Sequence, residues 1–128
     1  MRRDLSLMLG SALVLSIAAC GGDSKEEPGG GRASPELAAK GEVLFRKTCI
    51  ACHGPAGEGM PNLGKDMTRS EFIKSKTDEE LLAFIKVGRR PGDPLNTTGV
   101  DMPPKGGFPA LDEDDLKAIV AYIRTLMK

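Results

Sequence analysis

The sequence of 128 residues has few of the side chains that build aromatic cores and metal sites. It contains no tryptophan, one tyrosine, four phenylalanines, one histidine and three cysteines. It also shows no paired carboxylates, no nucleophile beside a base and no phosphate-binding loop. Because no catalytic set of residues stands out, we do not expect this chain to be an enzyme.

An excess of charge of one sign is also absent. The chain has 18 basic and 18 acidic residues, a formal net charge of zero. Loss of residues 1–19 would remove Arg2, Arg3 and Asp4, leaving 16 basic and 17 acidic residues and a formal charge of −1. Such a balance gives no reason to expect binding to nucleic acid or to an anionic membrane surface.

Residues 49–53 read Cys-Ile-Ala-Cys-His, and C-x-x-C-H is the pattern to which c-type haem is attached. Two thiols add across the haem vinyl groups, and the adjacent imidazole binds the iron. If the stretch continues a helix, Cys52 and His53 lie three and four residues beyond Cys49, so all three side chains share one face. We therefore expect one covalent haem c per chain, which would also supply apolar surface that a core poor in aromatics lacks.

The same residues could also belong to a zinc site or to a thioredoxin-like redox pair. A tetrahedral zinc site needs four ligands, usually as two separated pairs, but only Cys20 remains outside the motif and His53 is the single histidine. A thioredoxin-like redox pair is expected within a βαβ pattern, and strand signals are almost absent around it. Both alternatives are therefore weaker than covalent haem.

The first nineteen residues resemble an export signal. Arg2 and Arg3 form a basic start, and residues 5–19 are an almost continuous apolar run that is shorter than the ~20 residues needed to cross a bilayer. Residues 17–20, Ile-Ala-Ala-Cys, resemble a bacterial lipobox, which predicts lipidation of Cys20. The alternative is ordinary cleavage after Ala18, which would leave Cys20 as a spare thiol.

The rest of the chain divides into a tether and one domain. Residues 20–34 contain the predicted lipidated cysteine followed by glycines, charges and one proline, with no large apolar residue. As a glycine-rich coil, the fourteen residues from Gly21 would span roughly 20 Å. Residues 35–128 have the length of a single domain.

That domain is predicted to be all-α. Ser34 and Pro35 suit an N-cap and a first helical position, and the helix that they open should lead directly into Cys49. The segment 77–80, Thr-Asp-Glu-Glu, is a capping box for a second helix. Asp112 is predicted to cap the last helix. Its apolar stripe is Leu116, Ile119, Val120, Ile123 and Met127. A short helical turn at 70–75 is only weakly indicated.

Taken in order, these elements resemble a class I monohaem cytochrome c. The resemblance rests on a first helix that enters C-x-x-C-H, on Pro-Asn-Leu-Gly at 61–64, on Met-Pro at 102–103 and on an amphipathic last helix. It implies a small fold of three to five helices around one covalently attached haem. It also implies that the first and last helices cross. The residues expected at that crossing are Gly41 and Phe45, which would meet Ile119 and Tyr122.

The residues alone leave the sixth ligand of the iron open. Met60 and Met67 follow His53 so closely that little chain is left to round the edge of the macrocycle. The resemblance implies a thioether from a Met-Pro loop, which here is Met102, and Met60 is the second choice. A loop methionine is otherwise more often a core filler than a ligand.

The resemblance also implies residues around the haem. The Pro61 carbonyl should accept a hydrogen bond from the ring of His53, and Leu63 should pack on the macrocycle, although these residues also suit a simple turn. No tryptophan is present for a propionate, so Arg89 and Arg90 are the candidate donors. The alternative for this pair is a solvated end of a helix.

The function implied is one-electron transfer, because histidine–methionine ligation of haem is an electron-transfer arrangement. We expect a monomeric carrier, held at the periplasmic side of a membrane by its lipid, between a redox donor and an acceptor. One alternative is a sensor or peroxidase-like haem with an open sixth position. Another is the electron-entry subunit of an oxidoreductase. Several basic residues near the motif could dock an acidic partner, but interleaved aspartates favour solvated surface: Lys65, Lys86, Arg89, Arg90 and Lys105.

Overall fold

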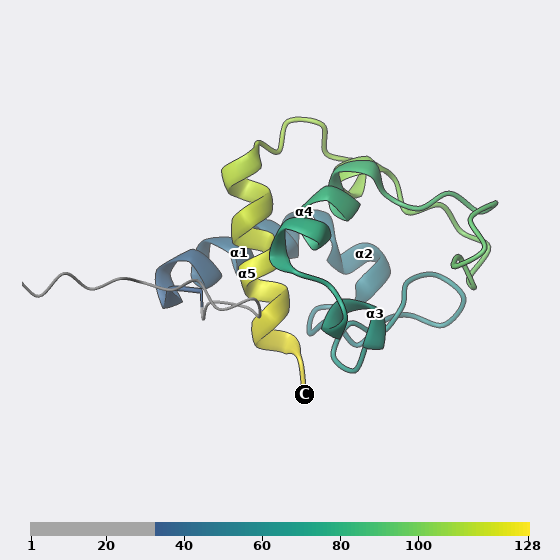
Figure 1. Ribbon diagram of the computed structural model, residues 1–128, viewed down its shortest axis with the longest axis horizontal. Helices are drawn as coiled ribbons and strands as arrows, with labels where there is room; N and C mark the ends of the chain where they lie inside the picture. The colour runs from purple at the N-terminus through teal and green to yellow at the C-terminus, as the bar shows by residue number, and fades with distance from the viewer. Residues whose placement is uncertain (1–32) are drawn as a thin grey trace, which may run out of the picture.

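The computed structural model describes residues 33–128 (Figure 1). The predicted signal, the predicted lipidation site Cys20 and most of the predicted tether lie outside the described residues. Within the described part, the chain forms five α-helices and one 3₁₀ turn, and no β-strand occurs. The all-α expectation is therefore confirmed. The elements are α1 (Pro35–Thr48), α2 (Ile50–His53), α3 (Glu71–Lys74), α4 (Asp78–Val87), η1 (Pro104–Gly107) and α5 (Glu113–Leu126).

Four helices begin at a side-chain cap, among them α3, where the Ser70 hydroxyl accepts from the Ile73 N–H. The Ser34 hydroxyl accepts a hydrogen bond from the Leu37 N–H at the start of α1. Thr77 and Asp112 each open a helix through a complete capping box, which satisfies donors that the first turn leaves free. Met127 was expected on the last helix, but α5 ends at Leu126 and Met127 has extended backbone angles.

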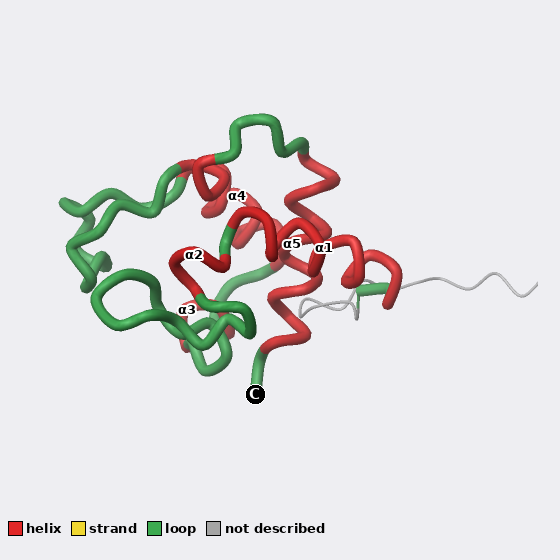
Figure 2. The backbone as a smooth tube through the Cα atoms, turned by 180° about the vertical axis from the view of Figure 1, so that it is seen from behind, coloured by secondary structure: helices red, strands yellow, loops and turns green. Residues whose placement is uncertain are grey.

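The first and last helices cross in direct contact, as expected (Figures 1 and 2). A Cβ atom at Gly41 would overlap the backbone carbonyl of Ala118 and lie 2.9 Å from the Cβ of Tyr122. One turn along α1, the ring of Phe45 meets that of Tyr122 edge to face, with centroids 5.2 Å apart. The small residue thus lets the two backbones approach, and the aromatic pair fills the space beside them.

The core spreads from this crossing toward α3 and α4. Phe45, Leu116, Ile119 and Val120 are the largest fully buried side chains. Arg124 on α5 fastens the segment between α3 and α4, because its guanidinium pairs with Asp78 and also donates to two backbone carbonyls. α5 therefore supports both α1 and the segment that carries α3.

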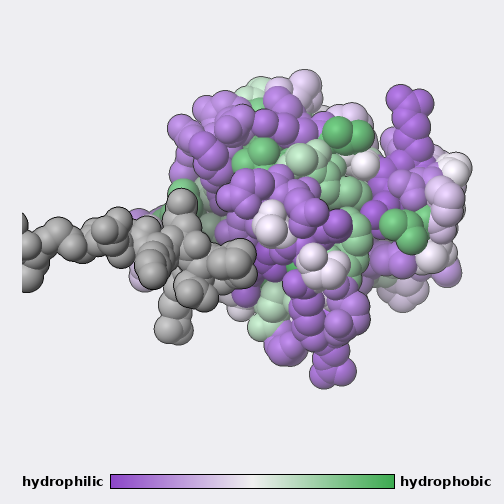
Figure 3. Space-filling model, in the orientation of Figure 1, coloured by the Kyte–Doolittle hydropathy of each residue, from purple (hydrophilic) through white to green (hydrophobic). Residues whose placement is uncertain are grey.

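Two long loops extend to the same side of the helices (Figures 1 and 2). The first, residues 54–70, follows α2, and the second, residues 88–103, joins α4 to η1. We call them the proximal loop and the distal loop. Figure 3 shows apolar residues among a largely hydrophilic surface. The exposed large apolar side chains are Val43, Met60, Val87, Leu95 and Phe108. No helix between residues 33 and 128 is long and apolar enough to span a bilayer.

Candidate functional site

The C-x-x-C-H residues form a single helical turn. α1 ends at Thr48, and Cys49 has φ −108°, so the helix is interrupted at the first cysteine rather than continuous through it. The N–H groups of Cys52 and His53 nevertheless both donate to the Cys49 carbonyl, at 3.2 and 3.0 Å. Gly54, with φ 76°, then turns the chain away. The two thiols and the imidazole therefore face one cavity, as the spacing predicts.

That cavity has a volume of about 860 Å³ and lies between the two loops and the helical core. A cavity of this size suits a cofactor, since ligand sites commonly enclose ~300–1,000 Å³. Its floor is apolar and comes from three helices, the main side chains being Ile73, Leu81, Ile85, Ile119 and Ile123. Leu63 also lines it, which is the position that the sequence indicates.

The ring of His53 is held by a different carbonyl from the one expected. Nδ1 lies 2.9 Å from the backbone oxygen of Lys65, not that of Pro61. The prediction of Pro61 as acceptor is therefore wrong. The physical reason is the turn at 60–64, which closes through paired hydrogen bonds between Met60 and Gly64 and needs φ 58° at Asn62. Pro61 is exposed at its tip, whereas Lys65 lies beyond the turn, where the chain reaches the imidazole.

The hydrogen bond to Lys65 fixes which ring nitrogen of His53 carries the proton. A carbonyl only accepts, so Nδ1 carries the proton and Nε2 keeps its lone pair for a metal. Burial lowers the pKa of His53, and the Lys65 carbonyl opposes that shift. Burial likewise raises the pKa of the Cys49 thiol, partly offset by its hydrogen bond with the Thr48 hydroxyl. Both groups are thus neutral near pH 7 in this environment.

Close backbone contact fixes the proximal loop against α2. A Cβ atom at Gly64 would overlap the backbone carbonyl of Cys52. Only glycine allows the loop to lie this near the motif. The loop thereby brings Leu63 and the Lys65 carbonyl to the cavity together.

Met102 lines the same cavity as His53 and comes from the distal loop. Its backbone forms two hydrogen bonds with Arg89, at 2.8 and 2.9 Å, which close the loop at its base. Gly88 makes this pairing possible, since a Cβ atom there would overlap the Met102 carbonyl. The glycine that ends α4 therefore also positions the loop that carries Met102.

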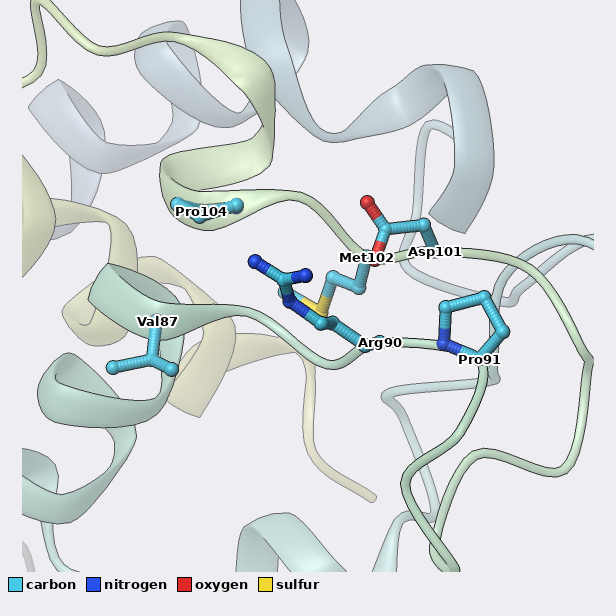
Figure 4. A pocket seen from close by; sticks show the side chains of 6 residues that line it. All are labelled: Val87, Arg90, Pro91, Asp101, Met102 and Pro104. Atoms are coloured by element: carbon cyan, nitrogen blue, oxygen red, sulfur yellow. The ribbon is translucent and has the colours of Figure 1, made fainter.

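Met102 also lines a second, smaller pocket of about 330 Å³ on the outer side of the loop (Figure 4). Its other lining residues are Val87, Arg90, Pro91, Asp101 and Pro104. Figure 4 shows the side chain of Arg90 reaching across this pocket toward Pro104. Residue 102 thus stands between the large cavity and the surface.

The other two candidate methionines differ from Met102. Met60 is 42% exposed, pairs with Gly64 in the turn and does not line the cavity. Met67 does line it, but it is buried in the apolar core next to the proximal loop. Among the three, Met102 is therefore the one on the loop opposite the His53 segment.

The two arginines are separated by the structure. Arg89 lines the cavity, and its guanidinium stacks 4.7 Å from the ring centroids of both Phe72 and Phe84. Its Nε is buried without a hydrogen-bond partner among residues 33–128, and the Asp93 carboxylate lies 3.6 Å away. Arg90 is exposed and does not line the cavity. The prediction that Arg90, like Arg89, donates to a propionate is therefore not supported.

Sequence reasoning missed three features of this site. The Lys65 carbonyl could not be identified from the sequence, because every residue has a backbone carbonyl. Phe72 and Phe84, which hold Arg89, belong to α3 and α4, and only their spacing from Arg89 could have indicated the contact. Asn96 also lines the cavity. It lies in a Leu-Asn-Thr-Thr-Gly segment, which indicates a turn and gives no sign of a role in the site.

The residues present fit a covalently attached haem. Two thiols and an imidazole with a free Nε2 face a largely apolar cavity, and a thioether lies on the opposing loop. The buried Nε of Arg89 lacks an acceptor, which an anionic group on the cofactor would supply. The zinc alternative does not fit, since residues 33–128 gather no group of three or more potential metal ligands among His, Cys, Asp and Glu. A thioredoxin-like arrangement fails as well, because this part of the chain has no strands.

Comparison with solved structures agrees with this arrangement. The crystal structure of cytochrome CL from the marine methylotrophic bacterium Methylophaga aminisulfidivorans MPT superimposes with a TM-score of 0.56 at 26% sequence identity. The match covers 73% of this chain and 55% of that one. The helical fold described above is therefore shared with a known cytochrome.

Curated proteins give the same result at the level of sequence. Cytochrome c-551 of Bacillus subtilis (strain 168) is 39% identical over 95 residues, which cover 70% of this chain and 79% of that protein. Cytochrome c4 of Thiocapsa roseopersicina is 29% identical over 121 residues, or 88% of this chain and 58% of the relative. The cbb3-type oxidase subunit FixP of Bradyrhizobium diazoefficiens is 33% identical, but the chain spans only 27% of its length.

Residues 38–127 match the family described as cytochrome c. This match covers every described helix except the first residues of α1. The protein carries covalent haem c and transfers electrons; it is not an enzyme. The chain belongs to the cytochrome c family.

Proposed function

We propose that this protein is a one-electron carrier in which His53 and Met102 ligate the iron of a single haem c. It takes electrons from one larger redox protein and delivers them to another. The observation that carries the proposal is that His53, at the end of α2, and Met102, on the distal loop, line the same cavity. Since an axial pair must approach the macrocycle from opposite faces, a thioether on a separate loop suits the sixth position.

The protein contributes positioning and exclusion of water. Bound haem supplies the one-electron chemistry, and a thioether ligand raises its potential. The Lys65 carbonyl fixes the tautomer and orientation of His53. The apolar floor would exclude water from a bound haem, which would favour electron transfer over reaction with small molecules. We assign Arg89 as donor to a propionate, supported by its buried Nε, and Leu63 as a contact of the macrocycle, supported by its place in the lining.

The proposal includes the parts of the chain outside the described residues. Residues 1–19 are proposed as a lipoprotein signal, residues 20–34 as a lipidated cysteine with its tether, and residues 35–128 as the haem domain. Attachment through Cys20 would keep the carrier at the periplasmic side of a membrane, as a monomer. The intact mass of the mature protein tests this: it should begin at Cys20 and include lipid, whereas a chain that begins at Ala19 without lipid contradicts the anchor.

A second candidate is the electron-entry subunit of an oxidase. It is favoured by similarity to oxidase subunits, which include FixP and the cytochrome c oxidase subunit 2 of Alkalihalophilus pseudofirmus, 29% identical over 97 residues. The chain spans about a quarter of each of these proteins. Purification from gentle detergent extracts separates the candidates: a carrier elutes free, and a subunit elutes with the oxidase.

The ligand assignment is tested by spectroscopy of the oxidised protein. A thioether ligand gives a weak near-infrared sulfur-to-iron band, and Met102→Ala should abolish it and lower the potential. Met60→Ala and Met67→Ala are the matched controls and should leave the band intact. If Met60→Ala alone removes it, the ligand assignment is wrong but electron transfer stands. If the reduced wild-type protein binds carbon monoxide readily, the sixth position is open and the sensor or peroxidase-like function takes its place.

A further inference from the structure

The distal loop has little apolar burial to hold it in place. Its base is closed by the Arg89–Met102 pair, but the segment between contains Pro91, Gly92 and Pro94 and has no helix or strand. Leu95, its largest apolar side chain, is 59% exposed. Pro94, Leu95 and Val100 line the large cavity, where a bound haem would cover them. Apart from that contact, hydrogen bonds within the loop define its conformation.

One side chain, that of Asn96, makes five of the hydrogen bonds in this loop. The amide nitrogen of Asn96 donates to the carbonyl of Arg90 at 3.1 Å and to that of Val100 at 2.7 Å. Its amide oxygen accepts from the N–H and the hydroxyl of Thr98 and from the N–H of Gly99, at 2.9–3.2 Å. Asn96 thus uses both donors and its acceptor at once, which few side chains in a loop achieve.

The two donor bonds join the two limbs of the loop. Arg90 follows Arg89 directly, and Val100 lies two residues before Met102. The backbone pair Arg89–Met102 is one hydrogen-bonded link across the loop, and we call such a link a rung. The Asn96 amide forms a second rung, between Arg90 and Val100, on the loop side of the first. Two rungs fix both the position and the direction of the segment that enters Met102, whereas one rung alone leaves the segment free to pivot.

We infer that Asn96 is a positioning residue for the distal ligand. It acts through Val100 and the loop, not by touching the haem iron. This inference rests on the proposed role of Met102. Loss of the Asn96 amide donors should let the Met102 segment open more often, while the core and the proximal side remain unchanged.

The test substitutes Asn96→Asp in the holoprotein. Aspartate still accepts from Thr98 and Gly99, but it has no hydrogen to give to Arg90 and Val100. The control is Asn62→Asp, which makes the same chemical change at the other asparagine, in the exposed turn of the proximal loop. Aspartate, like asparagine, adopts the positive φ that this turn needs, so the contact between Lys65 and His53 is kept. Thr98→Val is a second comparison: it removes the hydrogen bonds of the Thr98 hydroxyl with Asn96 and with the Val100 N–H, but it leaves both donor bonds of Asn96.

The readouts are the sulfur-to-iron band and the rate at which the reduced protein binds carbon monoxide. Loss of about 1.4 kcal/mol, roughly one net hydrogen bond, corresponds to a tenfold change in an equilibrium constant. We therefore expect Asn96→Asp to weaken the band and to raise the carbon monoxide rate about tenfold. Asn62→Asp should stay within about twofold of wild type, and Thr98→Val, which keeps the donor bonds of Asn96, should lie between the two.

Each other outcome is decisive. If Asn96→Asp matches Asn62→Asp in both readouts, or if Thr98→Val has an equal effect, the rung does not position Met102 and the inference is wrong, while the proposed carrier function stands. If the wild-type protein itself has no band, the ligand assignment fails and the positioning role falls with it. Should Asn96→Asp fail to yield holoprotein, Asn96→Ser, which keeps one donor and one acceptor, should show the same change at smaller size. Wild-type values in Asn96→Ser would overturn the inference.

Discussion

The backbone carbonyl of Ala118 occupies the place where a Cβ atom at position 41 would stand. This contact joins the two helices that enclose the haem domain, and it leaves no room for adjustment because the opposing atoms belong to the backbone. Tyr122 closes the same space from the next turn of α5. The crossing of α1 and α5 is therefore set by the absence of a side chain at Gly41.

Replacement of Gly41 by valine should force the two helices apart. We expect the free energy of unfolding of the holoprotein to fall by about 1–3 kcal/mol, as overpacking usually costs. Denaturant titration followed by far-UV circular dichroism measures it. Ala39→Val is the control, since Ala39 is exposed on the same helix and should lose no more than about 0.5 kcal/mol of helix propensity. Equal losses would contradict the close approach.

Gly64→Ala should disturb the proximal side of the site. The new methyl group would meet the Cys52 carbonyl, so the turn must shift and weaken the hydrogen bond between Lys65 and His53. A ligand imidazole that loses this acceptor is less basic, and the reduction potential should rise. Redox titration measures it. Gly92→Ala provides the comparison, because nothing lies within 4 Å of a Cβ atom at Gly92 and its potential should equal that of wild type.

The positive charge of Arg89 should favour the reduced haem. Arg89→Met keeps a flexible apolar stem but removes the charge beside the cavity, so we expect a lower reduction potential. Arg89→Lys retains the charge and should restore most of the difference. Arg90→Met serves as the control on the exposed neighbour outside the cavity. A drop of equal size in Arg90→Met would show that the effect is one of overall charge and not of the stacked guanidinium.

Stability at low pH should depend on Asp66. Hydrogen bonds from the hydroxyl and the N–H of Thr68, both 2.7 Å, hold the pKa of this carboxyl below its usual value. Its contribution to folding is therefore present above the unfolded pKa of about 3.9 and is lost as the pH falls through the lower folded pKa. The free energy of unfolding of Asp66→Asn, measured from pH 6 to pH 2, should therefore lack the part of the acid decline that comes from this carboxyl.

Asp101→Asn is the comparison for this titration, as an exposed carboxylate on the distal loop. If both variants change the curve equally, the Asp66–Thr68 contact does not govern the acid response.

The outcome of sequence reasoning depended on how each residue acts. The C-x-x-C-H spacing and the capping boxes are local, so residues 49–53, Thr77 and Asp112 predicted their structure correctly. The acceptor for His53 was misassigned because a backbone carbonyl carries no sequence signal. The angle at Asn62 decides whether Pro61 or Lys65 reaches the ring.

The two arginines illustrate a second reason. Arg89 and Arg90 are identical in sequence terms, but consecutive residues in an extended segment point to opposite sides. The pairing of Arg89 with Met102 decides which of them faces the cavity, and that pairing joins residues thirteen positions apart. Long-range contacts of this kind, including the stack of Arg89 on Phe72 and Phe84, are not encoded in local pattern.

The start of α1 lies at one end of the molecule, and the mouth formed by the two loops lies at the other (Figure 1). Any attachment of the chain ahead of Ser34 therefore acts at the pole remote from the redox centre. A protein held in this way could rotate about its point of attachment while the two loops that line the haem cavity stay free to meet donors and acceptors in turn. The same polarity makes the N-terminal end a suitable place to fuse a second domain or to immobilise the protein on an electrode without blocking electron flow.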